Sequence, residues 1–170
     1  MKIYRDNPLA EIPTFATEGS ACFDLSACLE EGKTVTAYNP HNRKMEMPIR
    51  KATDGRAFAS LQPGFRMLIP TGLIFDIPKN HVLNFYIRSS IALKYGIVLG
   101  NSVAVIDSDY VSPSYIMVLN TGDTPFTVYH GDRMAQAELR ELKTYTLTER
   151  KTPPAQKTDR DGGMGSTGTN

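Results

Sequence analysis

Two clusters of reactive side chains stand close together in the middle of the chain. The first, Arg88-Ser89-Ser90, joins a guanidinium to two hydroxyls, which are groups that bind phosphate oxygens. The second, Asp107-Ser108-Asp109-Tyr110, places two carboxylates and an aromatic ring after an apolar run. A carboxylate can act as a base, and a ring can stack on a sugar or a nucleobase. Together these groups indicate an enzyme that acts on a nucleotide.

Asp107 is the first candidate for catalysis. Hydrolysis at a phosphate needs a water molecule that is placed in line and relieved of a proton, and a fixed carboxylate can do both. General-base assistance of this kind is worth about 10²- to 10⁴-fold in rate. The alternative is structural, because Asp-Ser-Asp also forms an Asx-turn at the end of many strands.

Three further residues offer groups that a nucleotide would need. The guanidinium of Arg88 is a planar fork of fixed charge, which suits a polyphosphate. Ser89 offers a hydroxyl and also suits the N-cap of a short helix predicted over Ser90–Tyr95. Both roles of Ser89 are compatible, because an N-cap directs backbone N–H groups toward an anion. Asn101 follows Gly100 in a predicted hairpin turn, and its amide carries both a donor and an acceptor.

The segments that must position these residues alternate between apolar and polar side chains, which is the pattern of β-strands. In residues 22–29, four apolar side chains share one face, and the other face holds Cys22, Asp24, Ser26 and Cys28. Many short strands joined by turns predict an all-β sandwich or barrel with one short helix. Further runs of this kind lie at 65–75, 82–87, 97–99, 103–106, 115–119, 126–129, 134–139 and 145–147.

Length and composition narrow the class of protein. A chain of 170 residues that is 41% hydrophobic suits one domain with a sizeable core. Nineteen Lys and Arg against eighteen Asp and Glu leave a net charge of +1, so neither nucleic acid nor a membrane is expected as a partner. Residues 1–13 lack an apolar signal region and no run is long enough to span a bilayer, which predicts a soluble cytoplasmic protein.

The spacing of the two cysteines agrees with a cytoplasmic protein. Cys22 and Cys28 lie six residues apart in one alternating segment. On a single strand this spacing separates them by roughly 20 Å, well beyond the reach of a disulfide. Both thiols are therefore expected to be reduced, as in an intracellular protein.

Two segments do not suit a compact barrel. The first, at about 38–63, is polar and carries five basic against two acidic side chains, so we interpret it as a surface insert in a domain that spans 1–150. Beyond Arg150 the composition shifts to Lys, Thr, Pro and Gly. Such a stretch cannot offset its ordering entropy by core burial, so 151–170 is predicted to be a flexible C-terminal arm.

Five segments resemble, in the same order, the five motifs of the trimeric dUTPases (dUTP diphosphatases). The resemblance spans nearly the whole chain except the insert, and five motifs in order are far more specific than one. It implies a dUTPase-like β-barrel or jelly-roll and a Mg²⁺-dependent hydrolysis of dUTP to dUMP and pyrophosphate. The matching segments are Gly19-Ser20-Ala21-Cys22-Phe23-Asp24-Leu25, Arg88-Ser89-Ser90, residues 99–110, Gly131-Asp132-Arg133-Met134-Ala135-Gln136, and Arg160 with residues 162–168.

The resemblance implies a role for each residue near Asp107. Asp107 would activate the water that attacks the α-phosphorus, and Tyr110 would stack on the deoxyribose and leave no room for a 2′-hydroxyl. The hairpin that holds Asn101, Val105 and Ile106 would read the edge of uracil. Cytosine presents the reversed pattern of donors and acceptors, which leaves buried groups unpaired at a cost of about 1–3 kcal/mol each.

A second group of residues would hold the phosphates. The resemblance assigns Arg88, Ser89, Ser90 and the amide of Gln136 to the polyphosphate, and gives Arg133 no direct ligand role. It assigns Asp24 to Mg²⁺ through water, which suits an ion that keeps much of its hydration. The arm would close over the nucleotide with Arg160, Met164, Gly165, Ser166 and Thr167.

The family builds each site from three subunits of a homotrimer. One subunit gives the segments of Asp24, Arg88 and Gln136, a second gives the Asp107 hairpin, and a third gives the arm. This chain departs from the family pattern in the arm, where methionine replaces a phenylalanine that stacks on uracil and the spacing from Arg160 to the glycines is one residue shorter. Small side chains also replace three common glycines, at Cys22, Ala104 and Ser112.

Two alternatives share the fold. The dCTP deaminases also use Arg-Ser-Ser, but their catalytic glutamate lies shortly before an asparagine, and here Met117 has that place before Asn120. The other alternative is a trimeric binding or regulatory protein that uses the insert as its contact surface. The intact acids favour an enzyme and are compatible with such a second role.

Overall fold

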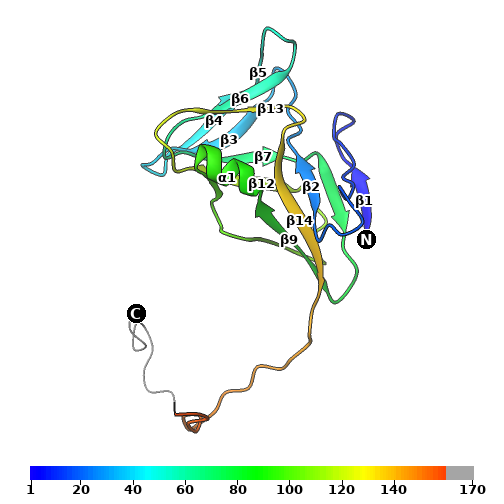
Figure 1. Cartoon of the computed structure of the whole chain (residues 1–170), viewed down its shortest axis with the longest axis vertical. Helices are drawn as coiled ribbons and strands as arrows, with labels where there is room; N and C mark the ends of the chain where they lie inside the picture. The colour runs from blue at the N-terminus through cyan, green and yellow to red at the C-terminus, as the bar shows by residue number, and fades with distance from the viewer. Residues whose placement is uncertain (160–170) are drawn as a thin grey trace.

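Strands dominate the computed structural model, which describes residues 1–159 (Figure 1). Within that range there is a single helix, of seven residues. This confirms the predicted all-β fold with one short helix. In chain order the elements are β1 (Lys2–Arg5), β2 (Phe23–Ser26), β3 (Thr34–Tyr38), β4 (Lys44–Pro48), β5 (Arg50–Lys51), β6 (Ala57–Leu61), β7 (Arg66–Pro70), β8 (Leu73–Asp76), β9 (His81–Ile87), α1 (Ser89–Tyr95), β10 (Ile97–Leu99), β11 (Ala104–Asp107), β12 (Tyr115–Asn120), β13 (Phe126–Tyr129) and β14 (Arg133–Glu141).

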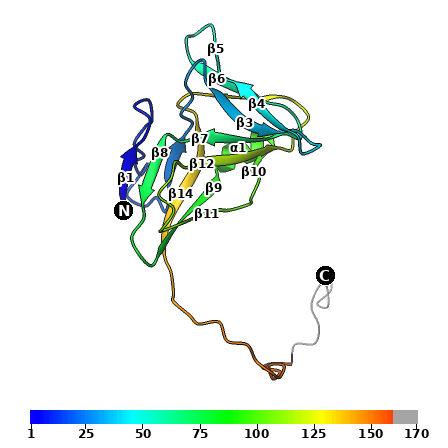
Figure 2. The same ribbon diagram turned by 180° about the vertical axis from the view of Figure 1, so that it is seen from behind.

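The strands of residues 1–159 form four antiparallel sheets around one apolar core (Figures 1 and 2). The largest sheet has the order β10-β12-β7-β3-β4, and the next has the order β11-β9-β14-β2. A third has the order β13-β6-β5, and β1 pairs with β8. Leu25, Ile69, Phe85 and Ile116 are fully buried between them. Burial of each such side chain stabilises the fold by about 1.5–3 kcal/mol.

The alternation predicted for residues 22–29 holds only as far as Ser26. Leu25 is buried and Asp24 is partly exposed as expected, but Cys28 is buried, so its assignment to the polar face is wrong. The reason is that β2 ends at Ser26. After Ser26, the N–H of Ala27 donates to the carbonyl of Asp132 in a loop, and the N–H of Cys28 donates to the carbonyl of Pro70 in another sheet. The alternation between buried and exposed side chains is therefore lost. Both cysteines are free thiols, as predicted.

The predicted run 65–75 folds as two strands, because Gly72 divides β7 from β8. Gly72 has a left-handed φ of 68°, and a Cβ there would lie 2.8 Å from the Cβ of Ala10 and from the Sγ of Cys28. A glycine therefore suits this position, because it adopts a left-handed φ without strain and because the neighbouring side chains leave no room for a Cβ. The chain uses this point to leave the large sheet and pair with β1.

The strand predicted at 145–147 is absent. Tyr145 and Leu147 lie beyond β14 and are 79% and 87% exposed. Residues 142–159 contain no helix or strand, and they run away from the sheets (Figure 2). This exposed stretch thus begins before the predicted arm boundary at 151. No helix within residues 1–159 has the length and apolar character needed to cross a bilayer.

The predicted surface insert at 38–63 is only partly at the surface. Strand β6 lies inside it, pairs with β13, and buries Ala59 and Leu61 completely. The surface part is the β3–β4 turn, strand β5 and residues 53–56, whereas Ile49 between β4 and β5 is buried in the core. Sequence reasoning missed β6 because two small alanines and a serine give it little apolar signal, while its partner strand lies far along the chain.

Replacing Leu61 by alanine is therefore expected to destabilise the fold by about 2–5 kcal/mol, because it leaves a cavity in the core. Met45 on β4 is 39% exposed and provides the control, since Met45→Ala should stay within about 0.5 kcal/mol. Urea unfolding of both variants measures the difference. Equal stability of the two variants would contradict the burial of Leu61 and would support the original assignment of residues 57–61 to the surface insert.

Candidate active site

A cavity of about 350 Å³ lies where β2, β14 and the start of α1 meet. We call it the Arg88 pocket. It brings together residues of three motifs that are far apart in the sequence, and all five residues that the resemblance assigned to phosphate or metal binding in this part of the chain line it. These residues are Asp24, Arg88, Ser89, Ser90 and Gln136.

A β-bulge in β14 gives the pocket its shape. Gln136 lies opposite Asp24 in the β14–β2 ladder, while the register shifts by one residue between Arg133 and Ala135. The extra residue, Met134, is fully buried together with its neighbour Ala135. Without the bulge, Arg133 and Gln136 would point to opposite faces of the sheet; with it, both face the pocket.

The charges of the pocket centre on Asp24, whose side chain is only 23% exposed. Its Oδ1 lies 3.1 Å from Nε of Arg88, and its Oδ2 lies 3.0 Å from Nη1 of Arg133. Arg88 also donates through Nη1 to the backbone carbonyl of Arg133 at 3.2 Å. One carboxylate thus holds two guanidiniums side by side. Sequence reasoning missed Arg133, because a regular strand would place it and Gln136 on opposite faces.

Helix α1 begins one residue earlier than predicted. Ser89 is its first helical residue, and the N-cap is Arg88, which makes no side-chain cap hydrogen bond. The prediction of Ser89 as the N-cap is therefore wrong. The physical reason is that Arg88 stays extended, with its N–H bound to Met134 of β14, so the turn into the helix starts directly after it. The exposed hydroxyl of Ser89 faces the pocket instead.

Cys22 also lines the Arg88 pocket. Burial raises the pKa of its thiol, and the nearby carboxylates of Glu138 and Asp24 raise it further. The thiol therefore stays protonated at neutral pH, and a protonated thiol is neither a nucleophile nor a metal ligand. Cys22 therefore forms a small neutral part of the pocket wall.

A second cavity, of about 230 Å³, forms the Asp107 pocket. The carboxyl group of Asp107 stands exposed at the end of β11. Tyr110 lies in the turn that follows, where its backbone N–H donates to the carbonyl of Asp107 at 3.1 Å. The hydroxyl of Tyr110 donates to the carbonyl of Pro113 at 3.0 Å. These bonds fix the ring. The predicted residues that line this pocket are Asn101, Val105, Ile106, Asp107 and Tyr110.

The turn that carries Asn101 does not close a two-stranded hairpin, contrary to the prediction. Strand β10 pairs with β12, and β11 pairs with β9 of a different sheet. The turn is closed locally by the N–H of Ser102 on the carbonyl of Leu99, and Ser102 has a φ of 63°. Residues from β7 and β12 complete the pocket wall. Sequence reasoning missed these residues, Leu68, Tyr115 and Met117, because only the β7–β12 pairing brings them there.

The two pockets have no lining residue in common within the chain. Asp107 and Asp24 project from the same outer face of the sheet β11-β9-β14-β2, but from opposite edges of it. Asp107 pairs with Val82 of β9, which in turn pairs with Arg140 of β14, so Asp107 lies at the same height in the sheet as Arg140. Asp24 pairs directly with Gln136 of β14. Three strand spacings sideways and four residues lengthwise separate the two carboxylates by roughly 20 Å.

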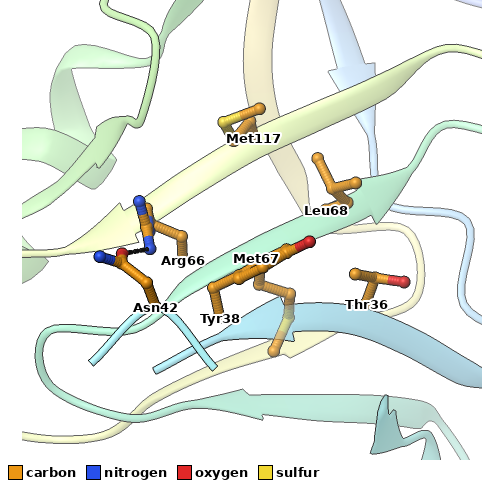
Figure 3. Close-up of a pocket in the computed structure, with 7 residues that line it drawn as sticks. All are labelled: Thr36, Tyr38, Asn42, Arg66, Met67, Leu68 and Met117. Carbon is orange, nitrogen blue, oxygen red and sulfur yellow. Dashed lines mark hydrogen bonds between the residues drawn. The ribbon is translucent and has the colours of Figure 1, made fainter. Parts of the chain in front are cut away.

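A third cavity, of about 280 Å³, is an apolar groove over β3, β7 and β12 (Figure 3). The guanidinium of Arg66 donates to Asn42 at one end of it. Leu68 and Met117 form a wall shared with the Asp107 pocket. The side chains that line the groove include no carboxylate, thiol or imidazole.

Comparisons with known proteins agree on one family. The dUTPase family model matches residues 55–168. The chain is 33% identical to the deoxyuridine 5′-triphosphate nucleotidohydrolase of Rhizobium rhizogenes over 93% of this chain and 85% of that protein. It is 39% identical to that of Rhizobium leguminosarum bv. trifolii over 81% of this chain and 87% of that protein. The chain belongs to the dUTPase family.

The fold agrees with this membership. The dUTPase of Staphylococcus bacteriophage 80alpha superposes with a TM-score of 0.75 at 15% identity, covering 98% of this chain and 97% of that one. Membership in the dUTPase family, together with Met117 before Asn120, decides against the deaminase alternative. The predicted arm residues, Arg160, Met164, Gly165, Ser166 and Thr167, lie outside the described residues, although the dUTPase match extends to residue 168.

Proposed function

We propose that this dUTPase hydrolyses dUTP to dUMP and pyrophosphate at sites shared between the subunits of a homotrimer. The observation that supports sharing is the separation of the Asp107 and Asp24 carboxylates by roughly 20 Å within one chain. A general base must lie within hydrogen-bond reach of the water it activates, and that water must lie next to the phosphorus it attacks. The Asp107 of one copy therefore serves the Arg88 pocket of another.

In this mechanism, Asp107 takes a proton from a water molecule as its oxygen forms a bond to the α-phosphorus. The bond from the α-phosphorus to the bridging oxygen breaks, and pyrophosphate leaves. Arg88, Ser89 and Ser90 hold the polyphosphate, and Gln136 donates its amide to the α-phosphate. These contacts keep the phosphorus in line with the attacking water, which is the larger part of what such an enzyme must do.

The Asp107 pocket would hold the nucleoside. Tyr110, fixed by its bond to Pro113, would lie against the deoxyribose and exclude a 2′-hydroxyl. The turn at Asn101 and the exposed stretch at Val105 and Ile106 would read the edge of uracil. Selection by hydrogen bonds is strong, because a wrong base leaves polar groups without partners.

The donor set of the Arg88 pocket fits Mg²⁺ that is held largely by the substrate. Asp24 supplies one carboxylate, and residues 1–159 contain no cluster of acidic, histidine or cysteine side chains able to hold an ion alone. Mg²⁺ is commonly bound by one or two carboxylates, water and substrate phosphates. Asp24 would hold it through water, and the ion would offset charge on the phosphate oxygens. A mutant dUTPase of the Staphylococcus aureus phage phi11 coordinates a structural Mg(II) ion.

The arm would complete the site from a third copy. Arg160 would meet the γ-phosphate, and Gly165, Ser166 and Thr167 would offer backbone amides and hydroxyls to the phosphates. Met164 would cover the base without the stacking that a ring provides. Closure of such a segment would exclude bulk water from the reaction.

Pyrophosphate release from dUTP, UTP, dCTP and dTTP in parallel tests this function. We expect dUTP to be hydrolysed at least about 10²-fold more efficiently than each of the others, because each rival leaves a polar group unpaired or meets a steric block. EDTA should abolish the activity and Mg²⁺ should restore it. Equal rates on dUTP and dCTP, or full activity in EDTA, would contradict the proposal.

A further inference from the structure

The Asp107 pocket contains a buried hydroxyl that the fold leaves unpaired. Ser114 lines this pocket and is only 2% exposed, yet its Oγ has no hydrogen-bond partner within residues 1–159. An unpaired buried hydroxyl costs free energy, and an apolar side chain of the same size would avoid that cost. A serine at this position therefore indicates a partner that comes from a bound ligand.

The polar groups bonded around Ser114 are already engaged. Its backbone N–H donates to the carbonyl of Leu73 at 2.9 Å, and its carbonyl accepts from both the N–H and the hydroxyl of Thr71, at 3.1 and 2.8 Å. The hydroxyl of Thr71 also accepts from the N–H of Leu73, and the hydroxyl of Tyr110 donates to Pro113. These bonds hold the backbone of Ser114 in place, while its hydroxyl can turn about one torsion among three staggered positions. The hydroxyl can therefore face a group bound in the pocket without any movement of the chain.

The place of Ser114 in the pocket indicates which part of the substrate it meets. The turn at Asn101 lies beside Met117, because the backbone N–H of Gly100 donates to the carbonyl of Met117 at 2.9 Å. Ser114 precedes Met117 by three residues, which is roughly 10 Å along an extended chain. It lies instead at the end of the pocket that holds Tyr110, whose hydroxyl bonds to the residue before Ser114. In the proposed mechanism Asn101 meets the base and Tyr110 meets the sugar, so Ser114 lies beside the sugar.

We propose that the hydroxyl of Ser114 binds the 3′-hydroxyl of the deoxyribose and so selects nucleotides that carry this group. In dUTP the base occupies C1′, the phosphates are attached at C5′, and C2′ has no oxygen, so the 3′-hydroxyl is the single hydroxyl of the sugar. A hydroxyl both donates and accepts, so it pairs with a serine whichever of the two supplies the proton. The inference rests on the proposed function, because it concerns the sugar of the same substrate.

The test measures, by calorimetry on the full chain, the binding of two ligands that are not hydrolysed: α,β-imido-dUTP and the same compound without its 3′-hydroxyl. We expect Ser114→Ala to raise the Kd for the first ligand about three- to tenfold and to leave the Kd for the second within about twofold. The Tm of the free variant should be unchanged or higher, because alanine removes a hydroxyl that is unpaired in the free protein. Ser112→Ala is the matched control and should match the wild type with both ligands, since Ser112 is exposed and does not line the pocket.

The paired ligands separate a contact with the sugar from a structural role of Ser114. Unchanged binding of α,β-imido-dUTP by Ser114→Ala would overturn the inference, and so would an equal loss for the two ligands accompanied by a lower Tm. If Ser114→Ala does not fold, Ser114→Cys replaces it, because a thiol is a weaker donor of similar size, and an equal change for both ligands would again overturn the inference. A wild-type protein that binds α,β-imido-dUTP but leaves dUTP intact would refute the proposed function and leave the comparison at Ser114 measurable.

Discussion

Replacement of Asp107 by asparagine is expected to slow the hydrolysis of dUTP by about 10²- to 10⁴-fold while leaving dUTP binding nearly unchanged. Asparagine has the size of aspartate and keeps the turn to Tyr110, because that turn is closed by the backbone. It has no carboxylate to take the proton from water. Single-turnover release of pyrophosphate measures the chemical step, and calorimetry measures binding.

Asp109→Asn is the matched control. Asp109 is an exposed acid two residues away, and it does not line the Asp107 pocket. Its replacement changes the local charge by the same amount but removes no group from the lining of the pocket, so it should leave turnover within about twofold. A near-normal rate in Asp107→Asn would remove Asp107 as the base. A similar loss in both variants would show an effect of charge rather than of proton transfer.

Mixing two inactive variants is expected to restore activity. Arg88→Met disables the Arg88 pocket and Asp107→Asn disables the other, so each variant alone should be nearly inactive. In trimers assembled at random from equal amounts, half of the copies carry an intact Arg88 pocket and half an intact Asp107. About one quarter of the shared sites then combine two intact halves, and the mixture should show about a quarter of the wild-type rate.

A second mixture sharpens the test. The wild type assembled at random with an equal amount of the double variant, Arg88→Met with Asp107→Asn, should also give about a quarter of the wild-type rate if sites are shared. If each chain held a whole site, this mixture would keep about half of the rate, and the mixture of single variants would stay inactive. Unfolding the proteins together and refolding them ensures random assembly.

Much of the fold and of the site could be predicted from local patterns. Strands β9 to β13 lie within one residue of the predicted runs, because alternation along one strand reports directly on which face is buried. The candidate roles of Arg88, Asp107 and Gln136 follow from their side chains and from the motifs around them, and all three residues line one of the two pockets. Strand β6 escaped prediction because its burial comes from β13, far along the chain.

The sequence by itself therefore determined which residues are candidates for the chemistry and that strands would hold them. Only the tertiary structure decided how those residues are grouped. The bulge at Met134 turns Arg133 into the Arg88 pocket, and the strand order sets Asp107 and Asp24 at opposite edges of one sheet. Bulges, register and strand order arise from pairing between segments remote in sequence, which no local period encodes.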